Sequence, residues 1–105
     1  PRVLLLNAAL GGATGNTAQA LARVRRQLAR HASVSELVLA DEPAAGLADW
    51  RAALAAADGF VFATGTHWDG WSSHLQRFLE VATPAECSPL WLGKPAVVVV
   101  TEHSV

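Results

Sequence analysis

Short apolar runs alternate with segments of helical periodicity along this chain, and that alternation restricts the fold more than any other feature. The runs are bounded by glycine-rich, acidic or proline-containing stretches, which is typical of buried strands separated by turns. The predicted strands are Arg2–Asn7, Val34–Leu39, Phe60–Thr64 and Pro95–Thr101. The predicted helices run from Asn16 or Thr17 to about His31, from Ala44 to Ala57, and from Trp71 or Ser72 to about Ala82. This alternation favours an α/β fold with a doubly wound parallel sheet and right-handed crossovers.

The polarity of the predicted strands indicates their order in the sheet. Ser35 and Glu36 interrupt the hydrophobic residues of Val34–Leu39, which suits a strand at a sheet edge. Phe60–Thr64 is almost wholly apolar and suits a central strand that is covered on both faces. Because the ligand site of such a sheet lies where the strand order reverses, between the first and third strands, the sequence predicts the order 2-1-3-4.

Size, charge and cysteine content narrow the class of protein. The 105 residues, 51% of them hydrophobic, predict one domain over 1–105, and no apolar run approaches the roughly 20 residues of a membrane-spanning helix. The formal net charge of -1 argues against nucleic acid or an anionic membrane as a partner. Cys87 is the only cysteine, and the N-terminus lacks the pattern of a signal peptide. These features predict a soluble, cytoplasmic protein.

The loop after the first predicted strand has the composition of a phosphate-binding turn. Gly11-Gly-Ala-Thr-Gly-Asn-Thr17 runs directly into a predicted helix, whose unpaired N–H groups and positive dipole end attract anions. The side chains of Thr14, Asn16 and Thr17 add uncharged donors. The alternative is that these residues only form a turn and cap the helix. The loop has neither the Gly-Lys-Ser/Thr ending of a P-loop nor the G-x-G-x-x-G pattern of a dinucleotide fold.

Short segments spread over nearly the whole chain match one known pattern. They are Leu4-Leu-Leu-Asn7, Gly15-Asn-Thr17, Ala57-Asp-Gly59, the stretch 65–78, Leu92-Gly-Lys-Pro95 and the stretch 101–104. Together they resemble the flavodoxin-like NAD(P)H-dependent FMN reductases, with flavodoxins as more distant relatives. Within 65–78, Trp68 and Ser72 match the family pattern, as do Leu75 and Phe78, whereas His67 replaces a tyrosine. The resemblance implies a flavodoxin-like fold that binds FMN.

The resemblance also implies which residues hold the FMN. The cofactor-binding positions are Ala9, Thr14, Gly15, Asn16, Thr17, Gly65, Thr66, His67, Trp68, Asp69, Thr101, Glu102, His103 and Ser104. The phosphate is expected in the first loop, and aromatic side chains such as Trp68 are expected to stack against the flavin ring. Ala9 and Gly11 stand where relatives often carry serine and arginine, so backbone N–H groups must contribute more of the phosphate binding. Glu102 and His103 replace two glycines of the family.

The function implied by the resemblance is that of an FMN-dependent oxidoreductase. Such an enzyme transfers a hydride from NADPH or NADH through bound FMN to a small acceptor such as a quinone or a flavin. Because the cofactor performs the chemistry, no catalytic side chain is expected, and the histidine spacing predicts no metal site. Two alternatives remain: a flavodoxin-type electron carrier with a protein partner, which the near-zero charge disfavours, and a flavodoxin fold that has lost flavin binding.

The last predicted strand leads to an expectation about the rest of the protein. The doubly wound pattern continues with a further helix and a fifth strand, yet only Glu102-His-Ser-Val105 follows Thr101. Val97–Val100 would then present an open edge and an uncovered apolar face. We therefore expect a chain roughly one and a half times this length, or a second copy that covers the strand. The resemblance implies a homodimer or higher homo-oligomer, because related enzymes commonly complete the nicotinamide site from a neighbouring subunit.

Overall fold

The computed structural model describes residues 1–9, 15–41, 46–65, 73–82 and 93–101. Its strands are β1 (Arg2–Asn7), β2 (Ser33–Val38), β3 (Gly59–Gly65) and β4 (Ala96–Thr101). Its helices are α1 (Asn16–Leu28), α2 (Leu47–Ala56) and α3 (Ser73–Ala82), with a short 3-10 helix, η1 (Leu39–Asp41). The predicted alternation of strands and helices is confirmed in these ranges. None of the described helices combines the length and the apolar character that crossing a membrane requires.

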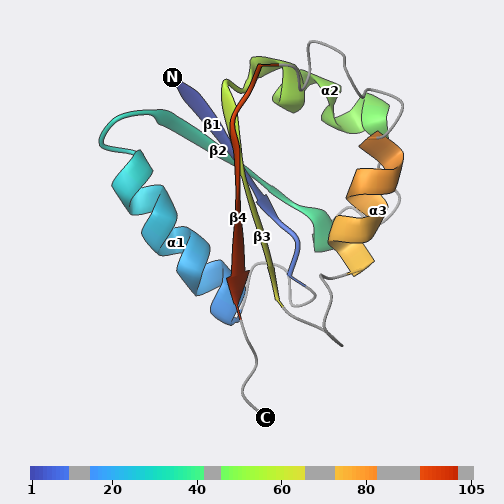
Figure 1. Cartoon of the computed structure of the whole chain (residues 1–105), viewed down its shortest axis with the longest axis horizontal. Helices are drawn as coiled ribbons and strands as arrows, with labels where there is room; N and C mark the ends of the chain where they lie inside the picture. Colours follow the sequence, from blue (N-terminus) through green and yellow to red (C-terminus); the bar gives the residue numbers. More distant parts are fainter. Residues whose placement is uncertain (10–14, 42–45, 66–72, 83–92, 102–105) are drawn as a thin grey trace.

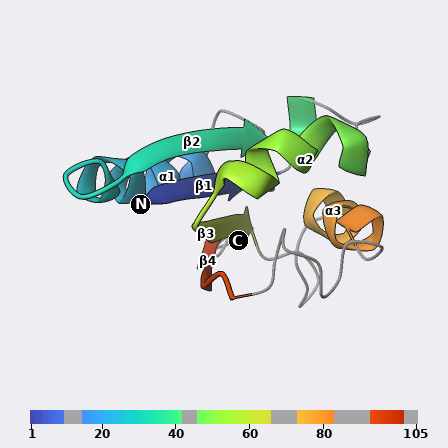
Figure 2. The same ribbon diagram turned by 90° about the horizontal axis from the view of Figure 1, so that it is seen from above.

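The four strands form one parallel sheet in the order β2-β1-β3-β4, as the sequence predicts. Figure 2 shows them side by side in this order. α1 lies on one side of the sheet, and α2 and α3 lie on the other (Figure 1). The strand order reverses between β1 and β3, which is the topology of the flavodoxin-like, doubly wound α/β fold.

Burial separates the central strand from the edge strand. Every residue of β3 is buried, because β1 and β4 flank it in the sheet and helices cover its faces. In β2, at the sheet edge, Ser33 and Ser35 are exposed while Val34 and Glu36 are partly buried. The predicted central position of β3 and the predicted edge position of β2 are both confirmed. The predicted end of this strand is one residue too late, because Leu39 turns into η1 and is buried in the core beside α2 and α3.

The sheet separates two apolar cores, as the alternation of side chains along a strand requires. The core on the side of α2 and α3 includes Leu4, Leu6, Trp50, Leu54, Phe60, Phe62, Leu75 and Phe78. The core on the side of α1 includes Leu5, Leu21, Val61 and Ala63. The rings of Trp50 and Phe78 pack with their centroids 4.8 Å apart, within the range of favourable aromatic pairs. This contact joins α2 to α3.

The C-terminal end of α1 differs from the prediction. The helix ends at Leu28, not near His31. The carbonyl oxygen of Leu28 accepts hydrogen bonds from the N–H groups of His31, at 2.9 Å, and Ala32, at 2.8 Å. These bonds close the helix with a tight turn that leads into β2, where the Ser33 N–H donates to the Pro1 carbonyl at 2.9 Å. The turn therefore ends the helix at Leu28 and directs the chain into its pairing with β1.

The start of α2 is fixed by a reciprocal pair of hydrogen bonds. The Gly46 N–H donates to Oδ2 of Asp49 at 2.7 Å, and the Asp49 N–H donates to the Gly46 carbonyl at 3.0 Å. The helix therefore begins at Leu47; the predicted start at Ala44 lies outside the described residues. Its predicted last residue, Ala57, has an extended backbone instead and leads into β3.

β4 is the edge strand beside β3, and its valine side chains are largely exposed. Val97 and Val98 are each 58% exposed, and Val100 is 55% exposed. Val99 packs against the core on the side of α1. The predicted exposure of this apolar strand is confirmed. Pro95 precedes the strand rather than starting it, and its carbonyl accepts the Phe60 N–H at 3.0 Å.

Candidate functional site

The carboxyl ends of β1, β3 and β4 lie at one end of the sheet, beside the first turn of α1. Asn7 of β1 pairs with Ala63 of β3, and Gly65 of β3 pairs with Thr101 of β4. Figure 1 shows the start of α1 next to the end of β4. In open parallel sheets, ligands bind at this end, near the reversal of strand order. We therefore take this end of the sheet as the candidate site.

Gly15 determines how the chain enters α1. Its φ of 98° and ψ of -172° lie in a region that only glycine adopts readily. A Cβ there would meet no atom within 4 Å, so the backbone conformation, not lack of space, requires glycine. Asn16 is the first helical residue and is exposed, and the first turn contains no acidic side chain and no side-chain cap. The N–H groups of this turn and the positive dipole end therefore favour an anion.

Two predicted site residues are brought into direct contact by the fold. Thr17 lies in the first turn of α1 and is buried, at 6% exposed, and Thr101 is the last residue of β4. Their Oγ1 atoms lie 2.7 Å apart, a hydrogen-bond distance, although the residues are 84 positions apart in the chain. This bond connects the candidate phosphate-binding turn to the strand end that leads into 102–105.

The turn after β1 is ordered by a buried side chain that the sequence analysis did not single out. Asn7 is fully buried, and its Oδ1 accepts the Ala9 N–H at 3.0 Å. The Ala8 N–H donates to the Ala63 carbonyl at 2.8 Å and extends the pairing with β3. Ala9, a predicted site residue, thereby follows directly on the last pairing of the chain with β3. An asparagine that ends an apolar strand was the available signal, because its side chain commonly bonds to the backbone two residues on.

Gly65 occupies a different element from the one predicted. The apolar pattern predicts that the strand ends at Thr64, whereas Gly65 is the last residue of β3 and is buried. The pairing of Gly65 with Thr101 of β4 extends the strand by one residue. Thr64 is 1% exposed, and its hydroxyl donates to the Gly65 carbonyl at 3.0 Å. Gly65 and Thr101 are thus neighbours at the candidate site.

The other predicted site residues lie outside the described residues. They are Thr14, Thr66, His67, Trp68, Asp69, Glu102, His103 and Ser104. The structure brings Ala9, Gly15, Asn16, Thr17, Gly65 and Thr101 to the same end of the sheet. Gly15, Asn16 and Thr17 lie at the start of α1, where the phosphate is expected. Ala9 follows β1, and Gly65 and Thr101 end β3 and β4 beside it. The stacking of aromatic side chains such as Trp68 against the flavin ring stays a prediction.

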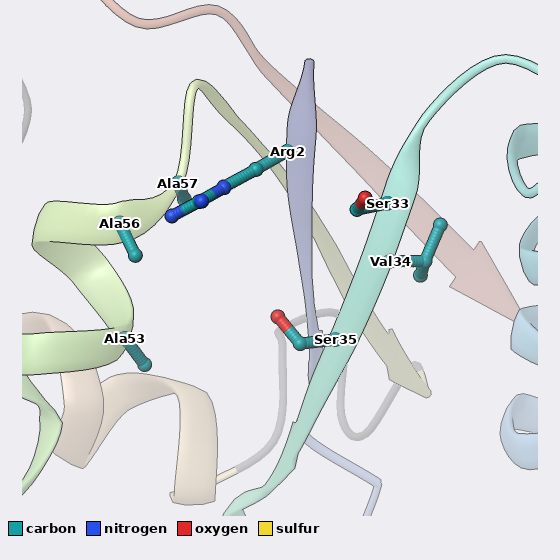
Figure 3. Close-up of a pocket in the computed structure, with 7 residues that line it drawn as sticks. All are labelled: Arg2, Ser33, Val34, Ser35, Ala53, Ala56 and Ala57. Carbon is teal, nitrogen blue, oxygen red and sulfur yellow. The ribbon is translucent and has the colours of Figure 1, made fainter.

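A pocket at the opposite end of the sheet has a different character. It is lined by Arg2, Ser33, Val34, Ser35, Ala53, Ala56 and Ala57. Figure 3 shows the Arg2 side chain extending from β1 toward the end of α2. A helix C-terminus carries partial negative charge, which disfavours an anion. The pocket also lies at the amino ends of β1 and β2, away from the usual ligand end of a parallel sheet.

The comparison with protein families identifies a family that the chain resembles over nearly its whole length. A family model described as "NADPH-dependent FMN reductase" matches residues 1–104. The match includes the turn before α1, the ends of β3 and β4, and every predicted site residue. A search of curated proteins gives no significant match.

Proposed function

Because the chain belongs to the NADPH-dependent FMN reductase family, we propose that it oxidises NADPH or NADH through bound FMN and reduces a small acceptor, a quinone or a free flavin. The family implies FMN and NADPH as cofactors. Bound FMN would supply the redox chemistry, as the acceptor of a hydride from the reduced nicotinamide and the donor of two electrons to the small acceptor. A net charge of -1 gives little electrostatic steering toward a charged protein partner, which supports a small molecule as the acceptor.

One observation carries the proposal: uncharged donors converge at the carboxyl end of the sheet. The first turn of α1 offers backbone N–H groups after Gly15, and the Thr17 hydroxyl lies in the same turn. A phosphate monoester accepts hydrogen bonds from such N–H and O–H groups. No acidic side chain lies in that turn to repel it. The described residues therefore fit the phosphate of FMN. The Asn7 side chain, bonded to the Ala9 N–H, holds the neighbouring turn in shape.

The proposed ring-binding side is formed by residues that follow β3 and β4. Gly65 and Thr101 end these strands side by side, so the segments after them start at adjacent points. Those segments contain His67, Trp68 and His103, whose flat side chains can stack on an isoalloxazine ring and exclude water. The order of the strands thus supports one binding site that has the phosphate at α1 and the ring beyond β3 and β4.

The proposed assembly is a homodimer or higher homo-oligomer. β4 presents Val97, Val98 and Val100 at 55% to 58% exposure on an edge strand of the sheet. Exposed apolar strands at a sheet edge favour pairing with another chain. A second copy of the protein is the proposed partner.

The test begins with flavin binding. The purified protein should show the absorption bands of bound FMN, or take up added FMN with quenching of its fluorescence. Anaerobic addition of NADPH should then bleach the flavin, and a quinone should restore the colour. A protein that binds no flavin would overturn the proposal. Bound FMN that exchanges electrons with redox proteins, but not with NADPH and quinones, would identify an electron carrier instead.

A further inference from the structure

The hydrogen bond between Thr17 and Thr101 gives a residue of β4 a role at the candidate phosphate site. A threonine hydroxyl has one hydrogen and two lone pairs. The two Oγ1 atoms lie 2.7 Å apart, so one hydroxyl donates and the other accepts. We infer that Thr101 is a positioning residue: by donating to Thr17, it leaves the single Thr17 hydrogen available to a phosphate. This inference rests on the proposed function.

The two possible directions of this bond have different consequences. If Thr17 donates to Thr101, its only hydrogen is used, and Thr17 offers lone pairs alone to a ligand. If Thr101 donates, the Thr17 hydrogen can point to a third atom. A phosphate dianion only accepts hydrogen bonds, so it favours the second direction. The resulting order of donation is from Thr101 to Thr17 and from Thr17 to the phosphate, and each bond in such a chain strengthens the next.

The fold holds both partners at fixed positions. Thr101 is paired with Gly65 at the end of β4, and the neighbouring Val99 packs on the core beside α1. Thr17 is 6% exposed, which limits replacement of the Thr101 hydroxyl by solvent. Loss of that hydroxyl would therefore leave Thr17 without its donor. Thr101 thus contributes to phosphate binding through Thr17 and has no need to touch the phosphate.

The test compares two flavins that differ in the phosphate. FMN and riboflavin are titrated into the flavin-free protein as wild type, Thr101→Val and Thr101→Ser. We expect Thr101→Val to weaken FMN binding about threefold to tenfold, because the Thr17 hydroxyl loses the contact that orients its hydrogen toward the phosphate, and to leave riboflavin binding within about twofold. Thr101→Ser keeps the hydroxyl and should restore FMN binding. Ser35→Ala, which removes an exposed hydroxyl from β2, is the matched control and should change neither affinity.

Two results of these titrations would refute the role of Thr101 in phosphate binding. Equal weakening of FMN and riboflavin by Thr101→Val, or no rescue by Thr101→Ser, would show that Thr101 has only a structural role. If Thr101→Val does not fold, judged by circular dichroism, Thr101→Ala is compared with Thr101→Ser in the same titrations.

A second measurement separates this inference from the proposed function. Inorganic phosphate should raise the Tm of the flavin-free wild type and of Thr101→Ser, and should raise that of Thr101→Val less. If phosphate raises the Tm of wild type and of Thr101→Ser more than that of Thr101→Val, but none of these proteins binds flavin, the proposed function fails and the role of Thr101 stands. If phosphate stabilises all variants equally and FMN binding is also unchanged, the role of Thr101 is refuted whatever the function.

Discussion

The ammonium group of Lys94 lies 2.9 Å from the carbonyl oxygen of Leu54, 40 residues earlier in the chain. It is also 3.4 Å from the carbonyl of Ala55 and 5.7 Å from the centroid of the Phe60 ring. Lys94 therefore closes the C-terminal end of α2, where the last carbonyls and the negative end of the helix dipole favour a cation. The lysine of the Gly-Lys-Pro segment thus holds α2 against the entrance to β4.

Replacing Lys94 by methionine should destabilise the protein. Methionine keeps much of the apolar stem but leaves the carbonyls of Leu54 and Ala55 without their charged donor, which should cost about 1 to 2 kcal/mol in the free energy of unfolding. Urea denaturation measures the change. Arg51→Met, at an exposed position of the same helix, is the control and should change stability by less than about 0.5 kcal/mol. Equal effects of the two substitutions would contradict this role of Lys94.

Asn7 is predicted to stabilise the turn after β1. Asn7→Ala removes the acceptor of the Ala9 N–H in a fully buried setting, and the expected loss is about 1 to 3 kcal/mol in the free energy of unfolding. Chemical denaturation with Gln19→Ala, an exposed residue of α1, as the reference would measure it. FMN binding should weaken as well, because Ala9 lies at the candidate site. An unchanged stability would mean that the backbone alone fixes this turn.

Thr14 and Thr17 are predicted to bind the FMN phosphate. Thr14→Ala and Thr17→Ala should each weaken FMN binding by about 1 to 3 kcal/mol for a lost hydrogen bond to a charged group, and the fold should survive. Isothermal titration of the flavin-free variants with FMN tests this, with Ser35→Ala as the control. If the double substitution left the affinity unchanged, the phosphate would have to bind elsewhere.

The exposed valines of β4 are predicted to mediate self-association. Val98→Lys and Val100→Lys place charges on side chains that are more than half exposed, so they should lower the mass measured by light scattering at little cost in stability. Ser33→Lys, at an exposed position of the opposite edge strand, should leave the mass unchanged. A wild-type protein that stays monomeric at every concentration would rule out this role.

The elements of the fold and their order were predictable because their signals are local. The apolar Phe60–Thr64 run and the polar interruption at Ser35 and Glu36 distinguish a central from an edge strand, and burial confirms both. The glycine before α1 was also predictable, because a chain that turns from a strand into a helix commonly needs glycine at that point. The strand order followed from these polarities and from the expected place of the reversal between the first and third strands, without any side-chain contact.

Contacts between residues that are distant in the sequence decided the features that local patterns did not predict. The sequence alone predicted that Thr17 lies at the start of a helix and that Thr101 ends a strand, and it assigned both to one site by resemblance. Only the tertiary structure brought their hydroxyls to 2.7 Å, because that distance depends on how β4 packs beside β3 and α1. The end of α1 at Leu28 and the contact of Lys94 with α2 were likewise decided by packing. Periodicity and polarity are properties of neighbouring residues, whereas a hydrogen bond across 84 positions depends on the folded arrangement of the whole sheet.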